Sequence, residues 1–204
     1  MTFIEEWDPS PNFSSREGRK IIAIVNHITA GSFEGALSWL KNPAAQASAH
    51  FIISKMGRIV QLVREGDKAW HAGSVNKPSW SLYDGTNPNL YTLGIEHEGQ
   101  PGDALTEDQY QATLFLHKEL TQKYGIPIDI DHIIGHHRID SVNKVNCPGS
   151  GFPWGRLFRD LSPSIPAPVD KDGYLMVRVL DSKADGVLKQ IVTMGYACKR
   201  ITLP

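Results

Sequence analysis

Several apolar segments of the chain have the length and the β-branched content of short buried strands. Residues 20–27 form the first, and it is nearly continuous. Residues 49–63 (AHFIISKMGRIVQLV) predict a hairpin that turns at Lys55-Met56-Gly57, where glycine supplies a positive φ. Residues 90–99 (LYTLGIEHEG) predict another strand, and residues 128–140 (IDIDHIIGHHRID) predict a strand followed by a turn. The segment between residues 74 and 90 is rich in Ser, Asn, Pro and Gly and predicts a long loop.

Two segments show helical spacing instead. Residues 33–40 place Phe33, Leu37 and Leu40 on one face of a short helix. Residues 105–125 predict a longer helix, with Thr106 as its N-cap and Gly125 as its stop. The apolar positions of this helix are Tyr110, Leu114, His117, Leu120 and Tyr124. Because strands and helices alternate while a hairpin is mixed in, we expect an α/β fold with a mixed central β-sheet flanked by helices.

The composition changes at residues 161–173 (LSPSIPAPVDKDG), where several prolines predict a stiff, extended linker. We therefore expect a main domain over residues 1–160 and a small C-terminal module over residues 174–204. The module reads as a strand, a helix and a strand. Because some thirty residues are too few for a stable core of their own, we expect it to form a homodimer or to dock on another surface.

The composition is that of an ordinary soluble protein. The chain has 204 residues, of which 41% are hydrophobic and 21% charged, and its formal net charge is -1. This balance lacks the basic footprint of a dedicated nucleic-acid binder. The N-terminus shows no basic region followed by an apolar stretch, so no secretory signal is expected. The apolar runs are far shorter than the roughly 20 residues that a membrane-spanning helix needs. We therefore expect a protein made in the cytoplasm, with no membrane insertion.

The candidate chemistry lies among the eight histidines and two cysteines. His27 ends the first predicted strand, His136 and His137 follow another, and Cys147 precedes a turn. A catalytic zinc ion takes three protein ligands of these types and leaves a fourth position to water. Side chains at the ends of neighbouring strands and in the next loop would converge on one edge of the sheet. The chain is therefore a candidate for binding one zinc ion.

Each of these residues also has a simpler interpretation. His27 alone is more often a hydrogen-bonded core histidine, and Cys147 alone is most often a small buried apolar residue. The spacing differs from that of a compact zinc finger, and no physical argument separates His136 from His137.

Five segments together resemble the zinc-dependent N-acetylmuramoyl-L-alanine amidase family, which includes phage endolysins, T7-type lysozyme and animal peptidoglycan recognition proteins. The segments are VNHITAG, SAHFIISKMGRIVQLV, KAWHAG, LGIEHEG and IIGHHRID…NCPG, in the order that the family has them, over roughly residues 20–160. The resemblance implies that His27, His136 and Cys147 hold the zinc ion. The family fills the third position with Cys or Asp. His137 is left outside the ligand set.

The resemblance also implies a proton-transfer role for Glu96, within the GIE element. Such a base needs a position near the metal and a pKa that suits the working pH. Glu98 lies two residues on and is the rival for this role. The simpler alternative for Glu96 is a strand-end salt bridge. T7-type members and recognition proteins keep a tyrosine where this chain has Ala49, which places more weight on Glu96.

A second departure concerns the lysine that the family places two residues before its third ligand. Here that position is Val145, and Lys144 comes one residue earlier. Lys144 is a candidate for stabilising the oxyanion, and an outward, solvated lysine is the alternative. Trp70 and His71, in the AWHAG element, are candidates for binding a sugar or a peptide. Alternatively, Trp70 packs in the core and His71 caps the loop.

The implied reaction is hydrolysis of the amide between N-acetylmuramic acid and L-alanine in bacterial peptidoglycan, which makes peptidoglycan the expected partner. Without an export signal, the chain resembles a phage endolysin or a prophage amidase that stays in the cytoplasm until the host membrane is permeabilised. The C-terminal module would then bind the cell wall or pair two chains. A recognition module that binds peptidoglycan without cutting it is the alternative, and a protein that works through a partner around a structural metal is another.

Overall fold

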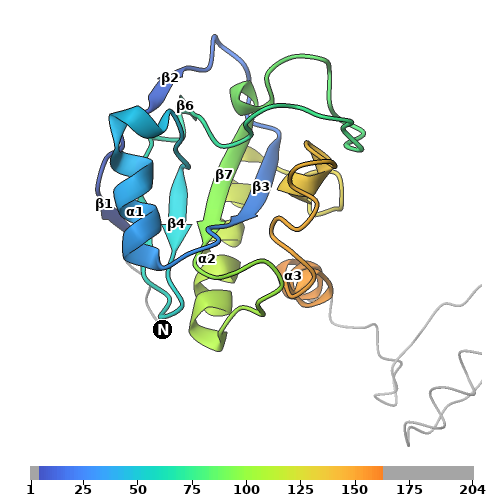
Figure 1. The fold of residues 1–204 in the computed structure, drawn as a ribbon. Coiled ribbons are helices and arrows are strands. Elements are labelled where there is room, and N and C mark those ends of the chain that lie inside the picture. Colours follow the sequence, from blue (N-terminus) through green and yellow to red (C-terminus); the bar gives the residue numbers. More distant parts are fainter. Residues whose placement is uncertain (1–4, 163–204) are drawn as a thin grey trace, which may run out of the picture. The chain divides into compact units, whose positions relative to one another are not determined.

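The computed structural model describes residues 5–162, which belong to one compact unit. Its centre is a six-stranded sheet with the order β1-β5-β4-β7-β3-β8 (Figure 1). The strands are β1 (Glu5–Trp7), β3 (Ala23–Ile28), β4 (Phe51–Ile53), β5 (Ile59–Gln61), β7 (Thr92–His97) and β8 (Ile133–Gly135). Only the β4–β5 pair is antiparallel; the remaining neighbours run parallel. The expected mixed α/β sheet is thus confirmed.

Helices cover both faces of this sheet. Ile52 of β4 packs with the buried face of α1 (Phe33–Lys41), whereas Phe51 and Ile53 pack with α2 (Glu107–Tyr124). Because successive side chains of a strand point to opposite faces, α1 and α2 lie on opposite sides of the sheet. A third helix, α3 (Trp154–Leu161), packs against α2. Figure 1 shows α2 behind β7, with α1 and α3 to either side of the central strands in this view.

The predicted helix ends are confirmed by their caps. The Thr106 side chain accepts a hydrogen bond from the backbone N–H of Gln109, and Gly125 follows the last turn with φ 64°. The buried face differs in part from the predicted one. Leu114 is only partly buried because it faces the cluster around α3, and Leu116 is fully buried under the sheet instead.

The sequence pattern missed the shortest elements. β1 was not predicted, and neither was the separate two-stranded sheet of β2 (Phe13–Ser15) and β6 (Asp67–Ala69). Three short 3₁₀ turns also appear: η1 (Pro43–Ala45), η2 (Pro88–Leu90) and η3 (His136–Arg138). Each element has only three residues, too few to show a repeating pattern of apolar positions. The hairpin was predicted, and Gly57 in its turn has φ +79°.

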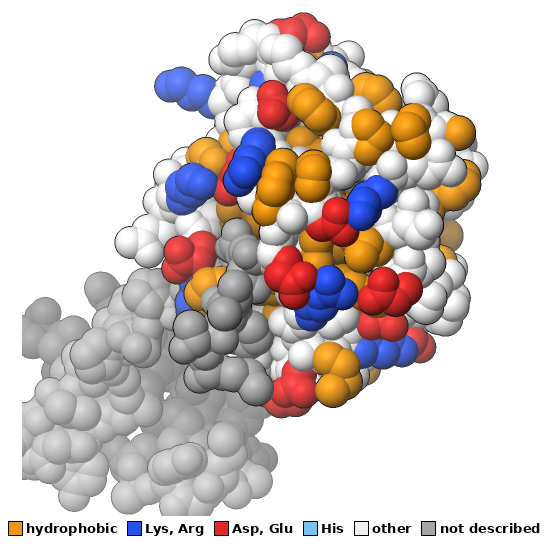
Figure 2. All heavy atoms as spheres, turned by 90° about the vertical axis from the view of Figure 1, so that its left-hand side faces the viewer, with side chains coloured by type: hydrophobic (Ala, Val, Ile, Leu, Met, Phe, Trp, Pro, Cys, Tyr) orange, Lys and Arg blue, Asp and Glu red, His pale blue; other side chains and the backbone are white. Residues whose placement is uncertain are grey.

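Most of the predicted linker and the whole C-terminal module lie outside the described residues. Within residues 5–162, no helix is long and apolar enough to span a bilayer. The face in Figure 2 carries acidic and basic side chains side by side among apolar ones.

Candidate metal centre

The site begins at the ends of the central parallel strands. β3 and β7 run parallel with His27 opposite Glu96, and β3 also pairs with β8, which ends at Gly135. Paired residues in neighbouring strands project from the same face of the sheet. His27 and Glu96 therefore share a face, and the chain that leaves β8 delivers His136 beside them.

Three candidate ligand atoms converge there. His27 Nδ1 lies 3.0 Å from His136 Nδ1 and 3.9 Å from Cys147 Sγ. All three ligand atoms lie within 4.8 Å of one another. Two imidazole nitrogens and one sulfur at this spacing match the donor set of a tetrahedral zinc site that keeps one position open. The structure thus brings the three predicted ligands together.

His136 is oriented by the carbonyl oxygen of Ala72. Its Nε2 lies 2.8 Å from that oxygen, and a carbonyl can only accept, so Nε2 carries the proton. The Nδ1 lone pair is left to face His27 and Cys147. Burial is the main cause that lowers the pKa of His136 to about 4, which keeps the ring neutral at pH 7. A neutral imidazole is the form that binds a metal.

The neighbouring His137 has a different task, which the sequence alone did not reveal. Its backbone N–H and its ring Nδ1 each lie 3.1 Å from the carbonyl oxygen of Cys147. A Cβ on Gly135 would lie 2.6 Å from the His137 ring, so glycine makes room for this contact. His137 therefore holds the backbone of the Cys147 loop, while His136 faces the centre.

Cys147 is half-buried and is a free cysteine. Burial, followed by the nearby Glu96 carboxylate, raises the pKa of its thiol to about 12. A divalent cation reverses this balance because a coordinated thiol loses its proton outright. This sulfur is therefore a poor nucleophile by itself and a suitable metal ligand.

Glu96 has the environment expected of a proton-transfer group. Its Oε2 is buried without a hydrogen-bond partner. Burial raises the pKa of Glu96 to about 7, and the positive charge of Lys144 opposes that rise. The rival Glu98 is engaged elsewhere, because its Oε2 accepts a hydrogen bond from the backbone N–H of Lys55 at 2.7 Å. Only Glu96 of the pair combines closeness to the candidate ligands with an unpaired oxygen.

Lys144 lies in the turn that leads to Cys147, and its backbone carbonyl accepts a hydrogen bond from the N–H of Cys147 at 2.9 Å. The residue is exposed, yet its charge lowers the pKa of Glu96, His27 and His136. Val145, at the position where the family places lysine, is 62% exposed. The ammonium of Lys144 therefore acts on the site from its solvent side.

The two residues predicted to bind substrate differ in their surroundings. Trp70 is partly buried, and its indole Nε1 donates to Ser14 Oγ at 3.0 Å. His71 is only 7% exposed, and its Nδ1 lies 3.1 Å from His27 Nε2. His71 is thus placed against a candidate ligand. Ala49, where some family members have tyrosine, is fully buried.

Sequence reasoning missed several contributors. Thr92 and Gly94 lie on the same face of β7 as Glu96, and Thr92 Oγ1 is 3.1 Å from His71 Nε2. The period-two spacing of Thr92, Gly94 and Glu96 was a signal in the sequence that all three face the site. Ala72, which contributes only its carbonyl oxygen, left no such signal.

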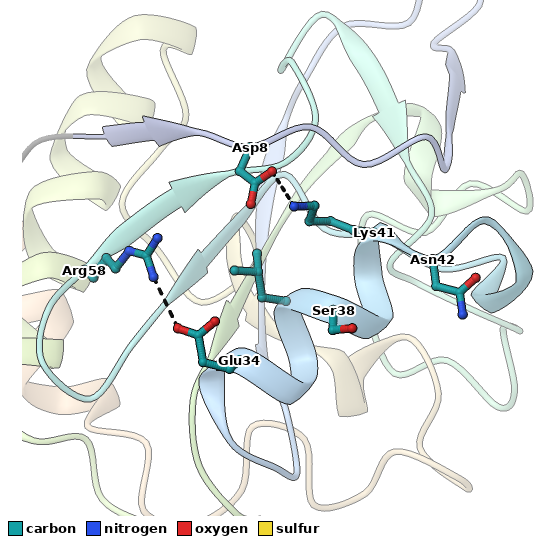
Figure 3. A pocket seen from close by; sticks show the side chains of 7 residues that line it. Asp8, Glu34, Ser38, Lys41, Asn42 and Arg58 are labelled. Atoms are coloured by element: carbon teal, nitrogen blue, oxygen red, sulfur yellow. Dashed lines mark hydrogen bonds and ion pairs between the residues drawn. The ribbon is translucent and has the colours of Figure 1, made fainter.

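A separate surface hollow lies beside α1 and the β4–β5 turn (Figure 3). Its lining residues are Asp8, Glu34, Leu37, Ser38, Lys41, Asn42 and Arg58. Its charges pair with one another: Lys41 Nζ lies 2.5 Å from Asp8 Oδ1, and Arg58 Nη1 lies 3.3 Å from Glu34 Oε1. None of the predicted site residues lines this hollow, and we assign the functional site to the histidine cluster.

Comparison with known proteins agrees with this geometry. The profile of the N-acetylmuramoyl-L-alanine amidase family matches residues 17–150. The chain is 32% identical over 173 residues to N-acetylmuramoyl-L-alanine amidase A of Achromobacter lyticus, covering 74% of this chain and 90% of that protein. It is 38% identical over 169 residues to the 1,6-anhydro-N-acetylmuramyl-L-alanine amidase AmpD of Salmonella typhimurium (strain LT2), covering 73% and 86%.

A solved structure gives the same picture. The Escherichia coli amidase AmiD, in complex with the substrate anhydro-N-acetylmuramic acid-L-Ala-D-gamma-Glu-L-Lys, superposes with a TM-score of 0.61 at 25% identity, covering 94% of this chain and 83% of that one. The matched profile spans the strands and turns that carry His27, Glu96, His136 and Cys147. The chain therefore belongs to the N-acetylmuramoyl-L-alanine amidase family.

Proposed function

We propose that the chain hydrolyses the amide bond between N-acetylmuramic acid and L-alanine in bacterial peptidoglycan, with one zinc ion as its cofactor. The observation that carries this proposal is the convergence of His27 Nδ1, His136 Nδ1 and Cys147 Sγ within 4.8 Å. The complex of AmiD with an anhydromuramyl peptide supports the substrate class.

His27, His136 and Cys147 would hold the zinc ion. When bound, zinc acts as a Lewis acid that activates a water molecule near pH 7 and polarises the scissile carbonyl. The protein's own contribution is to keep both histidines neutral through burial, with their Nδ1 lone pairs directed inward. The half-buried Cys147 gives the site one ligand that becomes negatively charged in the complex.

Glu96 would transfer the proton. With a pKa of about 7, its carboxylate can take a proton from the attacking water and pass it to the leaving amine of L-alanine. Its Oε2 has no competing hydrogen bond to break before it accepts. A divalent cation beside it would lower this pKa and keep more of the base ionised at neutral pH.

Lys144 would stabilise the oxygen that becomes negative in the transition state. Its placement on the solvent side of the ligands leaves its ammonium close enough to lower the pKa of Glu96. Trp70 would contribute an aromatic surface for the sugar or the peptide. His71 is buried against His27 and is therefore placed to orient that ligand instead of contacting the sugar or the peptide.

In the cell we propose a role in wall lysis, as in a phage endolysin or a prophage amidase that acts once the membrane is breached. Produced inside bacterial cells, the protein should lyse them only after the cytoplasmic membrane has been permeabilised. Equal lysis with and without permeabilisation would contradict this role while leaving the amidase reaction in place.

The reaction is tested by digesting purified cell walls with the wild-type chain and with Glu96→Gln. The wild type should lower turbidity and release new L-alanine amino groups without new reducing sugar ends. Glu96→Gln should retain zinc and lose about 10²–10⁴-fold in rate. Intact walls despite bound zinc would favour a protein that recognises peptidoglycan without cutting it. New reducing ends would identify a glycosidase instead.

A further inference from the structure

We propose that His71 and Thr92 are positioning residues that fix which nitrogen of His27 faces the metal. The proposal rests on the metal centre proposed above, and it extends that centre by two residues that lie behind the candidate ligand His27. A buried row of hydrogen bonds begins at the Pro88 carbonyl and ends at His27, and the direction of each bond determines that of the next.

The row starts at the Thr92 hydroxyl, which has two neighbours. The carbonyl oxygen of Pro88 lies 2.8 Å from Thr92 Oγ1, and His71 Nε2 lies 3.1 Å from it. A carbonyl oxygen can only accept, so the single hydroxyl hydrogen of Thr92 is donated to Pro88. The oxygen of Thr92 is then free to accept, and its partner must be an N–H on His71 Nε2.

This requirement fixes which nitrogen of His71 carries the proton. A neutral imidazole carries one proton, so a proton on Nε2 makes Nδ1 an acceptor. His71 Nδ1 lies 3.1 Å from His27 Nε2, and His27 must therefore donate from Nε2. The remaining nitrogen, His27 Nδ1, keeps its lone pair and faces His136 Nδ1 at 3.0 Å. The proton of His27 is held on the side away from the metal.

The two ligand histidines receive this support from adjacent residues. His71 accepts from His27, and the carbonyl oxygen of Ala72 accepts from His136 at 2.8 Å. The backbone N–H groups of His71 and Ala72 both donate to the Asn89 side-chain oxygen, at 3.2 and 2.8 Å. Residues 71 and 72, held by the Asn89 side chain, thus set the position of the proton on both ligand histidines.

Gly94 supplies an independent observation. A Cβ built on it would lie 2.4 Å from His71 Cγ and 2.7 Å from His71 Cδ2. Any side chain at this position would displace the His71 ring. Along one face of β7, Thr92 accepts from His71, Gly94 admits its ring, and Glu96 lies beside the ligands. The residues on this face of β7 therefore hold the His71 ring behind His27.

The consequence is measurable as metal affinity. Outer partners that orient a ligand histidine typically contribute 10–100-fold to metal binding. Without Thr92 to accept, the His71 proton can move to Nδ1, where it opposes the Nε2–H of His27. The His27 proton is then free to move to Nδ1 and must be displaced before a metal binds.

The test compares Thr92→Val with Thr92→Ser in the full chain. Zinc affinity is measured by competition with a chelator, and the site is followed separately by the absorption of the cobalt(II)-substituted protein. We expect Thr92→Val to lose about 10-fold or more in zinc affinity, with a shifted cobalt spectrum. Thr92→Ser keeps the hydroxyl and should stay within about 3-fold of the wild type. Equal affinities for the two variants would overturn the proposal.

A second pair of variants tests the link through His71. His71→Asn can place an acceptor oxygen near the former Nδ1 position without needing Thr92, whereas His71→Leu removes the acceptor. We expect His71→Leu to lose about 10–100-fold in affinity and His71→Asn clearly less. Adding Thr92→Val to His71→Asn should then change the affinity by less than about 3-fold, because the two residues act as one unit. Full additivity of the two changes would also refute the row of hydrogen bonds.

Thermal unfolding of each variant without metal separates a positioning effect from loss of the fold. If Thr92→Val does not fold, the comparison of His71→Asn with His71→Leu decides the question by itself. A wild-type chain that binds no zinc would refute the proposed metal centre. Normal zinc binding by the wild type and by every variant would refute only the role of His71 and Thr92.

Discussion

Five of the six buried histidines form two groups, one on each face of the same parallel strands; the sixth, His50, lies 2.6 Å from the Arg16 guanidinium. His27, His71 and His136 form the first group. His97 and His117 form the second, where His97 follows Glu96 in β7 and His117 belongs to α2. Because side chains alternate along a strand, His97 points to the face opposite that of Glu96. All five residues are at most 7% exposed, so burial does not distinguish the groups.

The hydrogen bonds distinguish them. In the first group, outer partners hold the protons of His27 and His136 on their Nε2 atoms, and the Nδ1 lone pairs of these two rings converge on the Cys147 sulfur. In the second group, His97 Nδ1 donates to the His27 carbonyl oxygen at 2.9 Å and His117 Nδ1 donates to the Thr113 carbonyl oxygen at 2.8 Å. Their Nε2 atoms are buried without partners, and no third ligand joins them among the described residues. A buried imidazole thus becomes a metal ligand through its outer partner and a third donor, and otherwise it remains a neutral core residue.

Replacing the third ligand should have the largest effect. Cys147→Ala leaves two histidines, too few for a stable catalytic zinc site, and wall digestion should fall by more than about 10³-fold with zinc lost from the purified protein. Cys147→Asp is the matched control, because the resemblance implies that the family accepts either residue there, and it should retain zinc. Normal zinc content in Cys147→Ala would show that Cys147 is not a ligand. The third donor would then no longer distinguish the first histidine group from the second.

Acid should lower stability because buried histidines are neutral in the fold, and His117 of the second group isolates one such contribution. Burial lowers the pKa of His117 to about 4 from 6.5. Between these values the unfolded chain binds a proton that the folded chain does not, so the contribution to stability is present above pH 6.5 and is lost as the pH falls toward 4. This contribution is about 3 kcal/mol for a full shift of this size.

Urea unfolding of the metal-free protein at several pH values between 7 and 4 measures this loss. His117→Leu removes the titrating group, so its free energy of unfolding should fall less steeply with acid than that of the wild type. An unchanged slope would show that His117 does not remain neutral in the fold.

Removing the charge of Lys144 should have a smaller effect, confined to the first group. Lys144→Met should lower kcat/KM by about 10-fold, less than for a fully buried oxyanion donor, because the side chain is exposed. It should also move the acid limb of the pH profile to higher pH, because the lysine charge lowers the pKa of Glu96. Lys144→Arg keeps the charge and should leave that limb in place. If the acid limb of the pH profile does not move in Lys144→Met, the Lys144 ammonium does not act on the pKa of Glu96.

Exchanging Glu98 should have the smallest effect. Its carboxylate accepts from the backbone N–H of Lys55, and Gln at this position still offers an acceptor oxygen. Glu98→Gln should change the rate of wall digestion by less than about 3-fold, well below the change expected for Glu96→Gln. A loss as large as that of Glu96→Gln would reassign the proton transfer to Glu98.

The sequence predicted the parts of the site that depend on strand ends. His27, Glu96 and His136 lie at or directly after the ends of apolar strands, and parallel strands bring such residues to one edge of a sheet. It did not separate His136 from His137, because that choice depends on a three-residue turn and on the position of the Cys147 carbonyl. It also could not show that His71 is buried. The hydrogen bonds of His71 join residues 27, 71 and 92, and no local pattern records contacts between such distant positions.

The in-register pairing of β3 with β7 divides the site into a rigid part and a replaceable part. His27 and Glu96 are spaced by the ladder of backbone hydrogen bonds between two central strands. Cys147, in contrast, arrives on a surface turn held by a few local bonds. Engineering of metal preference should therefore target the segment from residue 140 to residue 148, where a new ligand can be exchanged without disturbing the register of the sheet.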